Sequence, residues 1–243
     1  MTLAADAARS PRPRATEGKQ QMMRNRRSTA AIIFLAVVLG AGCGNWRGPG
    51  FQASGPEMPR LRHELALKPG MSVADVGAGS GELTVALAAE VGPSGQVFST
   101  DIDTQALEQI RALVAAAALQ NVTVVQAHAR DTGLPTNCCD VVVLRRVYHH
   151  LSDPLATNGD LLRALRPGGV LAVSDFPPML SWLWPWVPKG VPQNRRGHGV
   201  AVPLVVEEVT ASGFELVQVI EDWPGRGPLA SYCVVFRKPR DRQ

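Results

Sequence analysis

A glycine-rich turn between an expected strand and an expected helix constrains this chain more than any other feature. Residues 72–76 form a short apolar run, and Gly77, Gly79 and Gly81 follow at alternating positions before a helical pattern begins. Glycine tolerates φ > 0 and lets a ligand approach the backbone closely, while the first N–H groups of the helix point outward. The turn therefore predicts a binding site for a nucleotide-like ligand.

Apolar runs alternate with helical patterns after residue 57, which is typical of βαβ units and a parallel sheet. The expected strands are 72–76, 96–100, 122–126, 140–144, 170–174, 214–220 and 230–236. The expected helices are 58–67, 81–90, 103–118, 154–165 and 203–212. A short Pro/Gly segment joins the last two strands, so we expect them to be antiparallel. This order predicts an α/β, Rossmann-like, doubly wound, mostly parallel seven-stranded sheet with an antiparallel final strand.

Two carboxylates near the turn indicate which ligand it holds. A dinucleotide fingerprint has a third glycine where this chain has Glu82. Asp75, two residues before the first glycine, would repel a pyrophosphate and attract an ammonium group, such as that of S-adenosylmethionine (SAM). Asp101 stands at the tip of the second strand, where an acidic residue binds ribose hydroxyls. Asp103 is expected to cap the following helix.

Five segments occur in the order seen in class I SAM-dependent methyltransferases, and the chain resembles the small-molecule group that includes the ubiquinone/menaquinone methyltransferases. These segments are Val73–Gly81, Asp101, Gln126–Pro135, Asp140–Asp153 and Leu165–Asp175. The resemblance covers about residues 58–237 and implies SAM as cofactor. It implies cofactor-binding roles for Asp75, Gly77, Ala78, Gly79, Gly81, Asp101, Ile102, His128, Ala129 and Leu144. Many relatives have Gly-Asp-Ala where this chain has Ala127-His128-Ala129.

The candidate catalytic residues follow the fourth expected strand, at the edge where such sheets bind ligands. His149 or Tyr148 is predicted to act as a base or to hold the acceptor; the alternative is that this helix start only packs. Arg145 is predicted to hold an anionic substrate or to face solvent. The resemblance implies that His198 contacts the acceptor. No Cys-x-x-Cys motif or His/Cys cluster is visible, so no metal is expected.

The N-terminal segment has the layout of an export signal. Residues 1–28 carry seven basic and two acidic residues, and the uncharged residues 29–42 precede Cys43. The order resembles a bacterial lipoprotein signal; an uncleaved anchor or a spurious tail are the alternatives. The remaining residues carry 18 basic and 19 acidic side chains, so the net charge of +4 does not indicate nucleic-acid binding. We expect a signal over residues 1–43, a linker over 44–56 and one domain over 57–243.

These observations favour a membrane-anchored SAM-dependent methyltransferase of the cell envelope that acts on a small, lipophilic acceptor. A non-catalytic SAM-binding lipoprotein is one alternative, because SAM is made in the cytoplasm and an exported domain would lack it. An NAD-dependent oxidoreductase is another, which the glycine spacing disfavours. The Trp-rich residues 179–187 are predicted to form an apolar lid or a packed loop. The side of the membrane and the oligomeric state cannot be read from the sequence.

Overall fold

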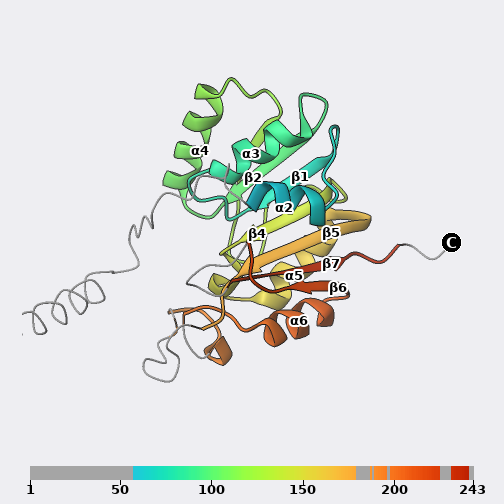
Figure 1. The fold of residues 1–243 in the computed structure, drawn as a ribbon. Coiled ribbons are helices and arrows are strands. Elements are labelled where there is room, and N and C mark those ends of the chain that lie inside the picture. The colour runs from blue at the N-terminus through green and yellow to red at the C-terminus, as the bar shows by residue number, and fades with distance from the viewer. Residues whose placement is uncertain (1–56, 179–186, 188, 196–197, 225–230, 241–243) are drawn as a thin grey trace, which may run out of the picture. The chain divides into compact units, whose positions relative to one another are not determined.

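A seven-stranded sheet in the order β3-β2-β1-β4-β5-β7-β6 organises the part of the chain that the computed structural model describes, residues 57–178, 187, 189–195, 198–224 and 231–240 (Figure 1). The strands are β1 (Ser72–Val76), β2 (Gln96–Asp101), β3 (Val122–Gln126), β4 (Cys139–Arg145), β5 (Leu165–Asp175), β6 (Glu215–Ile220) and β7 (Tyr232–Arg237). Every expected strand is present, within a few residues of its predicted bounds except at the start of β5.

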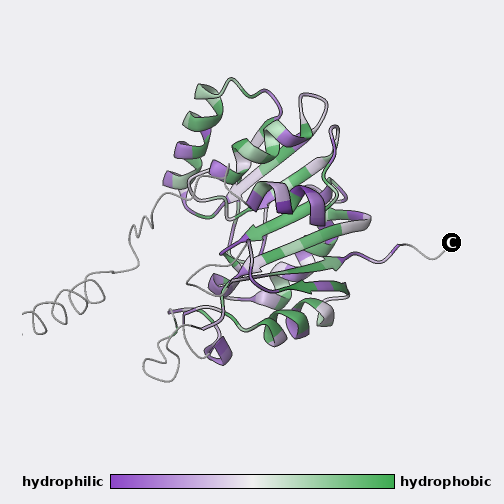
Figure 2. Ribbon diagram, viewed as in Figure 1, coloured by the Kyte–Doolittle hydropathy of each residue, from purple (hydrophilic) through white to green (hydrophobic). Residues whose placement is uncertain are grey.

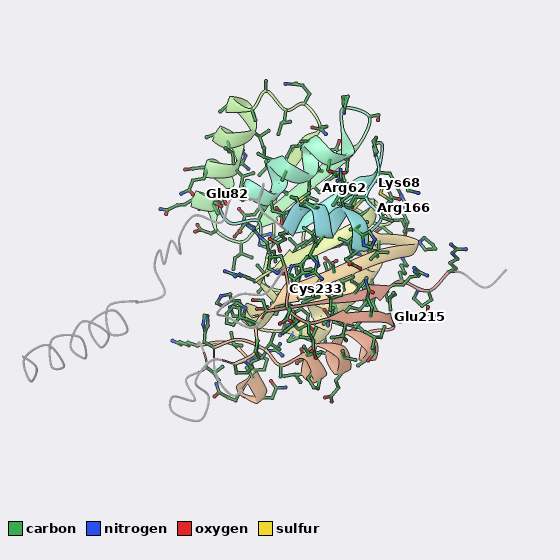
Figure 3. The ribbon with its side chains drawn as sticks, in the orientation of Figure 1. Arg62, Lys68, Glu82, Arg166, Glu215 and Cys233 are labelled. Atoms are coloured by element: carbon green, nitrogen blue, oxygen red, sulfur yellow. The ribbon has the colours of Figure 1, made fainter. Side chains whose placement is uncertain are left out.

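The strand directions confirm the predicted topology. β1 pairs in parallel with β2 and with β4, and β2–β3 and β4–β5 are also parallel. β7 is antiparallel to both of its neighbours, β5 and β6. The carboxyl ends of β1, β2 and β4 therefore meet at one edge of the sheet. In Figure 3, Glu82 at the start of α3 lies toward this edge, and Arg166 near the start of β5 lies at the other.

Alternate residues of the central strands bury their side chains on opposite faces of the sheet, as the period of two requires. In β4, Val141 and Val143 pack with α2 and α3, whereas Val142 and Leu144 pack with α5 and α6. Strands buried on both faces become almost continuously apolar, and Figure 2 shows this hydrophobic centre between helices of mixed hydropathy. The β-branched runs of the sequence are thus explained by a three-layer arrangement.

Five α-helices of the described chain cover the sheet, and aspartate side chains cap two of them. They are α2 (Glu57–Glu64), α3 (Glu82–Val91), α4 (Thr104–Ala116), α5 (Pro154–Ala164) and α6 (Val202–Ala211), with short 3₁₀ turns η1 (Tyr148–His150) and η2 (Gln193–Arg195). The Asp103 carboxylate accepts a hydrogen bond from the Gln105 N–H and caps α4, as predicted. Asp153 caps α5 in the same way through Ala156.

Strand β5 begins at Leu165, five residues earlier than predicted. The predicted strand began at residue 170, but the structure also draws Pro167-Gly168-Gly169 into the sheet. Gly168 N–H donates to the Lys238 carbonyl, and Lys238 N–H donates to the Gly169 carbonyl. The pairing with β4 is irregular between Cys139 and Val141, where this glycine segment enters.

The cysteines of the described chain are free thiols. Cys139 and Cys233 are buried and Cys138 is half-buried. Cys233 lies within β7 (Figure 3). Burial raises the pKa of its thiol to about 12, so it stays protonated and unreactive at neutral pH.

Several sequence predictions concern residues outside the described chain. These are the signal over residues 1–43, the linker over 44–56 and all but Val187 of the Trp-rich stretch. Among the residues that are described, no helix combines the length and apolar character needed to cross a bilayer.

A pair of opposite residues on β7 and the edge strand β6 provides a stability test. Phe236 is fully buried and lies opposite Leu216, which is 45% exposed. We expect Phe236→Ala to lower the free energy of unfolding by about 3–5 kcal/mol, because it opens a cavity in the core. The control Leu216→Ala should cost less than about 1 kcal/mol. Denaturant titration measures both, and equal losses would contradict this difference in burial.

Candidate functional site

The glycine turn links β1 to α3 and is fastened to the end of β2. Gly77, Gly79 and Gly81 have φ values of 71°, 55° and 78°, a left-handed region that side chains disfavour. The N–H groups of Gly77 and Ala78 both donate to the Thr100 carbonyl, at 2.8 and 3.0 Å. This fixes the turn beside the tip of β2.

The three glycines differ in what surrounds them. A Cβ on Gly77 would lie 2.4 Å from the Val147 side chain, and one on Gly81 would lie 3.0 Å from Ile110. A Cβ on Gly79 would meet nothing within 4 Å. Gly77 and Gly81 are therefore required by packing, whereas Gly79 borders open space that a ligand can use. Gly81 also supplies no side-chain cap, so the first N–H groups of α3 have no partner from that position.

Asp101 ties the turn to the second strand. One carboxylate oxygen accepts the Gly79 N–H at 2.9 Å, and the other accepts the Asp103 N–H at 2.9 Å. A carboxylate oxygen has more than one lone pair, so Asp101 retains capacity for ribose hydroxyls. The neighbouring Ile102 is 67% exposed, which leaves its side chain available to an adenine face.

Gln126 is a positioning residue that sequence reasoning did not single out. Its amide donates to the carbonyls of Asp101 and Ile102, at 3.3 and 3.0 Å. The Ala127 N–H donates to the Asp101 carbonyl as well, at 2.9 Å. The end of β3 is thus bound to the tip of β2. The sequence signal that could have identified Gln126 is a side-chain amide at the end of one strand, next to an acidic residue at the tip of the neighbouring strand.

His128 and Ala129 follow β3 at the expected adenine side and are exposed. The backbone of His128 pairs with that of Asp131 in an isolated bridge. The Ala129 carbonyl accepts a 3.5 Å hydrogen bond from the Thr157 hydroxyl. Leu144, by contrast, is fully buried near the end of β4. The cofactor roles of these residues stay predictions, and the burial of Leu144 favours a packing role for its side chain.

Asp75 carries a buried charge directly behind the turn. It is 1% exposed, and its carboxylate accepts the Thr84 hydroxyl at 2.7 Å. Thr84 and Ser99 hydroxyls are also 2.7 Å apart, so the three side chains form a small network. Burial raises the pKa of Asp75 to about 6, while the Thr84 hydrogen bond and then Arg145 act to lower it. A cationic ligand beside the turn would favour the charged form.

His149 is oriented by a second buried acid, Asp175, at the end of β5. Its Nδ1 lies 2.8 and 3.0 Å from the two Asp175 carboxylate oxygens. The backbone N–H groups of His149 and Phe176 also donate to this carboxylate. Because a carboxylate only accepts, Nδ1 carries a proton, and in the neutral ring Nε2 then carries the lone pair. Asp175 was not predicted, although an acid at a strand tip is the same signal that identified Asp101.

Tyr148 turns into the core instead of toward the glycine turn. Its side chain is fully buried, and its hydroxyl accepts a 2.8 Å hydrogen bond from Asn158 of α5. The Arg195 guanidinium lies 5.5 Å from its ring. Burial raises its pKa well above the ordinary value. The predicted catalytic role for Tyr148 is therefore disfavoured, and of the two candidates His149 is retained.

Arg145 faces neither open solvent nor an empty anion site. Its Nη1 lies 3.5 Å from Glu57 of α2, and its side chain is 18% exposed. Glu57 also accepts the indole N–H of Trp223 at 3.0 Å. This arrangement neutralises much of the Arg145 charge. It favours a structural role over the predicted contact with an anionic substrate.

His198 approaches the histidines that follow β4, which places it beside the predicted acceptor region. Its ring centroid is 4.8 Å from that of His149 and 5.7 Å from that of His150, with Phe176 at 5.4 Å. Loss of hydration, followed by the neighbouring imidazoles, lowers the pKa of His150 to about 4 and also lowers that of His198. The sequence did not reveal this cluster, because residues 150 and 198 lie far apart in the chain.

The residues around the turn fit SAM. Open space at Gly79 admits a ligand against the backbone, and the buried Asp75 carboxylate provides a negative charge for an ammonium or sulfonium group. Asp101 lies across the turn and can accept ribose hydroxyls. The turn offers no third glycine for the dinucleotide spacing, and the negative charge of Asp75 opposes a pyrophosphate there.

Comparison with known proteins agrees with this geometry. Residues 67–201, more than half of the chain, match a family described as "Methyltransferase domain". A crystal structure of a SAM-dependent methyltransferase from Aquifex aeolicus is similar with a TM-score of 0.62 and 25% identity, covering 78% of this chain and 93% of that one.

Curated relatives are similar over a shorter region. The ubiquinone/menaquinone biosynthesis C-methyltransferase UbiE of Shewanella halifaxensis is 34% identical over 110 residues, covering 45% of this chain and 44% of that protein. The corresponding protein of Ectopseudomonas mendocina is 38% identical over 122 residues, covering 48% of this chain and 46% of that protein. The chain thus spans less than half the length of these relatives.

Substitution of Asp75 tests the electrostatics of the turn. The folded protein holds a proton on Asp75 up to a pH of about 6, whereas the unfolded chain releases it near 3.8. The charge therefore destabilises the fold progressively as pH rises through this window. We expect Asp75→Asn to match the wild type below pH 4 and to be up to about 3 kcal/mol more stable above pH 6. Denaturant titration across pH measures this difference, and a pH-independent difference would contradict it.

Proposed function

We propose that this chain, which belongs to the family of class I SAM-dependent methyltransferase domains, transfers a methyl group from SAM to a small, lipophilic acceptor. The observation that carries the proposal is the hydrogen bond between the Gly79 N–H and Asp101, which joins the glycine turn to the strand-tip acid beside open space. The names of the curated relatives place them in quinone biosynthesis, which supports a small lipophilic acceptor.

Each residue of the turn then has a defined task. SAM, when bound, supplies a methyl group on an electrophilic sulfonium. Asp75 provides the negative charge behind the turn, and the N–H groups at the start of α3 provide donors for the carboxylate of the cofactor. Asp101 accepts ribose hydroxyls, and the exposed Ile102 packs against the base.

The acceptor side of the site is formed by the turn after β4. Val147 packs against Gly77, so the segment that carries His149 touches the glycine turn directly. Asp175 holds the His149 ring by Nδ1, so in the neutral ring Nε2 can accept a proton or hold a ligand. Alignment of the acceptor supplies most of the rate in such a displacement, up to about 7–11 kcal/mol. His149 is therefore proposed to act as base or as acceptor clamp.

Two glycine variants test the cofactor site. Gly79 and Gly92 both have positive φ, at 55° and 65°, and a Cβ on either meets nothing within 4 Å. They lie at opposite ends of α3. Alanine at Gly79 should cost about 1–2 kcal/mol in stability. Alanine at Gly92 should cost at least as much, because its ψ of −178° lies in a region that almost only glycine adopts. Only Gly79→Ala adds a methyl group to the proposed SAM site, so only this variant should lose affinity, by at least about tenfold.

Calorimetry with SAM and S-adenosylhomocysteine on the full chain measures these affinities, and Gly92→Ala is the matched control. Equal affinities in the two variants would remove the turn from the cofactor site. SAM binding without turnover of any acceptor would instead favour the alternative of a non-catalytic SAM-binding protein.

Membrane attachment through residues 1–43 is proposed as well, with lipidation of Cys43 and an envelope location. The basic residues 1–28, the uncharged residues 29–42 and the cysteine that follows support it. Fractionation of the tagged full chain and of Cys43→Ser tests the proposal. A wild-type protein in the membrane and a variant released from it are expected. Wild-type protein in the soluble fraction would contradict membrane attachment, and a variant retained in the membrane would favour an uncleaved anchor.

A further inference from the structure

The structure assigns a divalent transition-metal site to His149, His150 and His198, at the carboxyl end of β4. Each imidazole offers one nitrogen, and these donor atoms all lie within 4.8 Å of one another. Two of the residues sit in the turn η1, and the third comes from the segment before α6.

Three imidazoles are a donor set that transition metals prefer. Neutral imidazole nitrogen suits Zn²⁺, Cu²⁺, Ni²⁺ and Fe²⁺, whereas Mg²⁺ and Ca²⁺ prefer oxygen. Zinc–nitrogen bonds of 2.0–2.1 Å place tetrahedral donors about 3.3 Å apart, so closure requires side-chain movements of about 1.5 Å or less. Three protein ligands also leave a coordination position open, as in catalytic zinc sites.

The Nε2 atom of His149 is an independent indication of a ligand. The side chain is only 2% exposed, and this nitrogen has no hydrogen-bond partner. A buried polar atom without a partner costs about 1–3 kcal/mol, so such atoms are rare unless a ligand or an ion satisfies them. In the neutral ring the lone pair lies on Nε2, because Nδ1 donates to the Asp175 carboxylate. This atom is therefore a ready metal ligand.

Asp175 completes the arrangement expected around a metal-bound histidine. Such histidines nearly always donate their second ring N–H to a carboxylate or carbonyl, which fixes the ring and raises its basicity. Asp175 accepts this N–H at 2.8 Å and is itself held by the N–H groups of His149 and Phe176.

The position of the site relates it to the methyl acceptor. Val147, two residues before His149, packs against Gly77 of the glycine turn. An ion at the cluster would occupy the lone pair of His149 Nε2, so His149 would act as acceptor clamp and not as base. The ion would hold an acceptor by an oxygen atom, such as a hydroxyl or carbonyl, beside the cofactor; this part of the inference rests on the proposed function. The metal site would restrict the acceptor to small molecules that carry an oxygen donor near the atom that receives the methyl group.

Metal titration of the full chain tests the site. Protein stripped with a chelator is titrated with ZnCl₂ in a calorimeter, and with Co²⁺ while visible absorption is recorded. We expect one equivalent of either ion and a cobalt spectrum of nitrogen ligation without thiolate charge transfer. His198→Ala and His150→Ala remove ligands that are not deeply buried, so each should weaken Zn²⁺ by at least about tenfold.

Asp175→Asn removes the carboxylate that orients His149 and should weaken Zn²⁺ by about 10–100-fold. His63→Ala is the matched control, because His63 lies on α2 with a side chain that is 83% exposed. It should bind zinc like the wild type. Equal affinity in wild type and His198→Ala, or a cobalt spectrum of thiolate ligation, would overturn the inference.

SAM affinity measured on the same samples separates the two proposals. Zinc binding without SAM binding would remove the proposed function and leave the metal site. SAM binding without zinc binding would remove the metal site and leave the proposed function.

Discussion

The parallel pairing of β1 with β2 on one side and β4 on the other is the constraint on which the whole site depends. It brings the turn after β1, the acid at the tip of β2 and the histidines after β4 to one edge of the sheet. The hydrogen bond from Gly79 to Asp101 and the contact of Gly77 with Val147 then join these segments. The glycine turn, whose position the local sequence does not determine, is thereby held in place, with open space for a ligand at Gly79.

Buried carboxylates give this edge its chemistry, at a cost in stability. Asp75 in β1 and Asp175 at the end of β5 are each 1% exposed. Removing a charge from water is unfavourable, and hydrogen bonds offset only part of the loss. Asp75 shows the cost as a raised pKa, while Asp175 is held by three N–H groups and orients a histidine. Both carboxylates lie where their negative charge would stabilise a bound cationic ligand or metal ion.

The fold was predictable from local sequence, because its signals are local. Alternating apolar runs predicted the strands, and the Asp103 cap placed the start of α4 within one residue. Gly77, Gly79, Gly81 and Asp101 were identified for the same reason. The start of β5 was missed because pairing with β4 and with Lys238 overrides the turn preference of its glycines.

Interactions between distant segments could not be predicted in this way. The pairing of Arg145 with Glu57 depends on how α2 covers the sheet. The burial of Tyr148 against Asn158 depends in the same way on α5. Neither contact follows from sequence spacing. The same is true of His198, which joins His149 and His150 only after the chain folds. The sequence suggested no metal ligands because it shows no compact ligand motif.

The central claim is that the glycine turn and its two carboxylates select an adenosyl sulfonium over a dinucleotide. Equilibrium dialysis of labelled SAM against the full chain, with unlabelled competitors, tests it most directly. The account predicts saturable retention of SAM that S-adenosylhomocysteine displaces and NAD⁺ does not. Retention of NAD⁺ with no measurable affinity for SAM or its thioether product would contradict it.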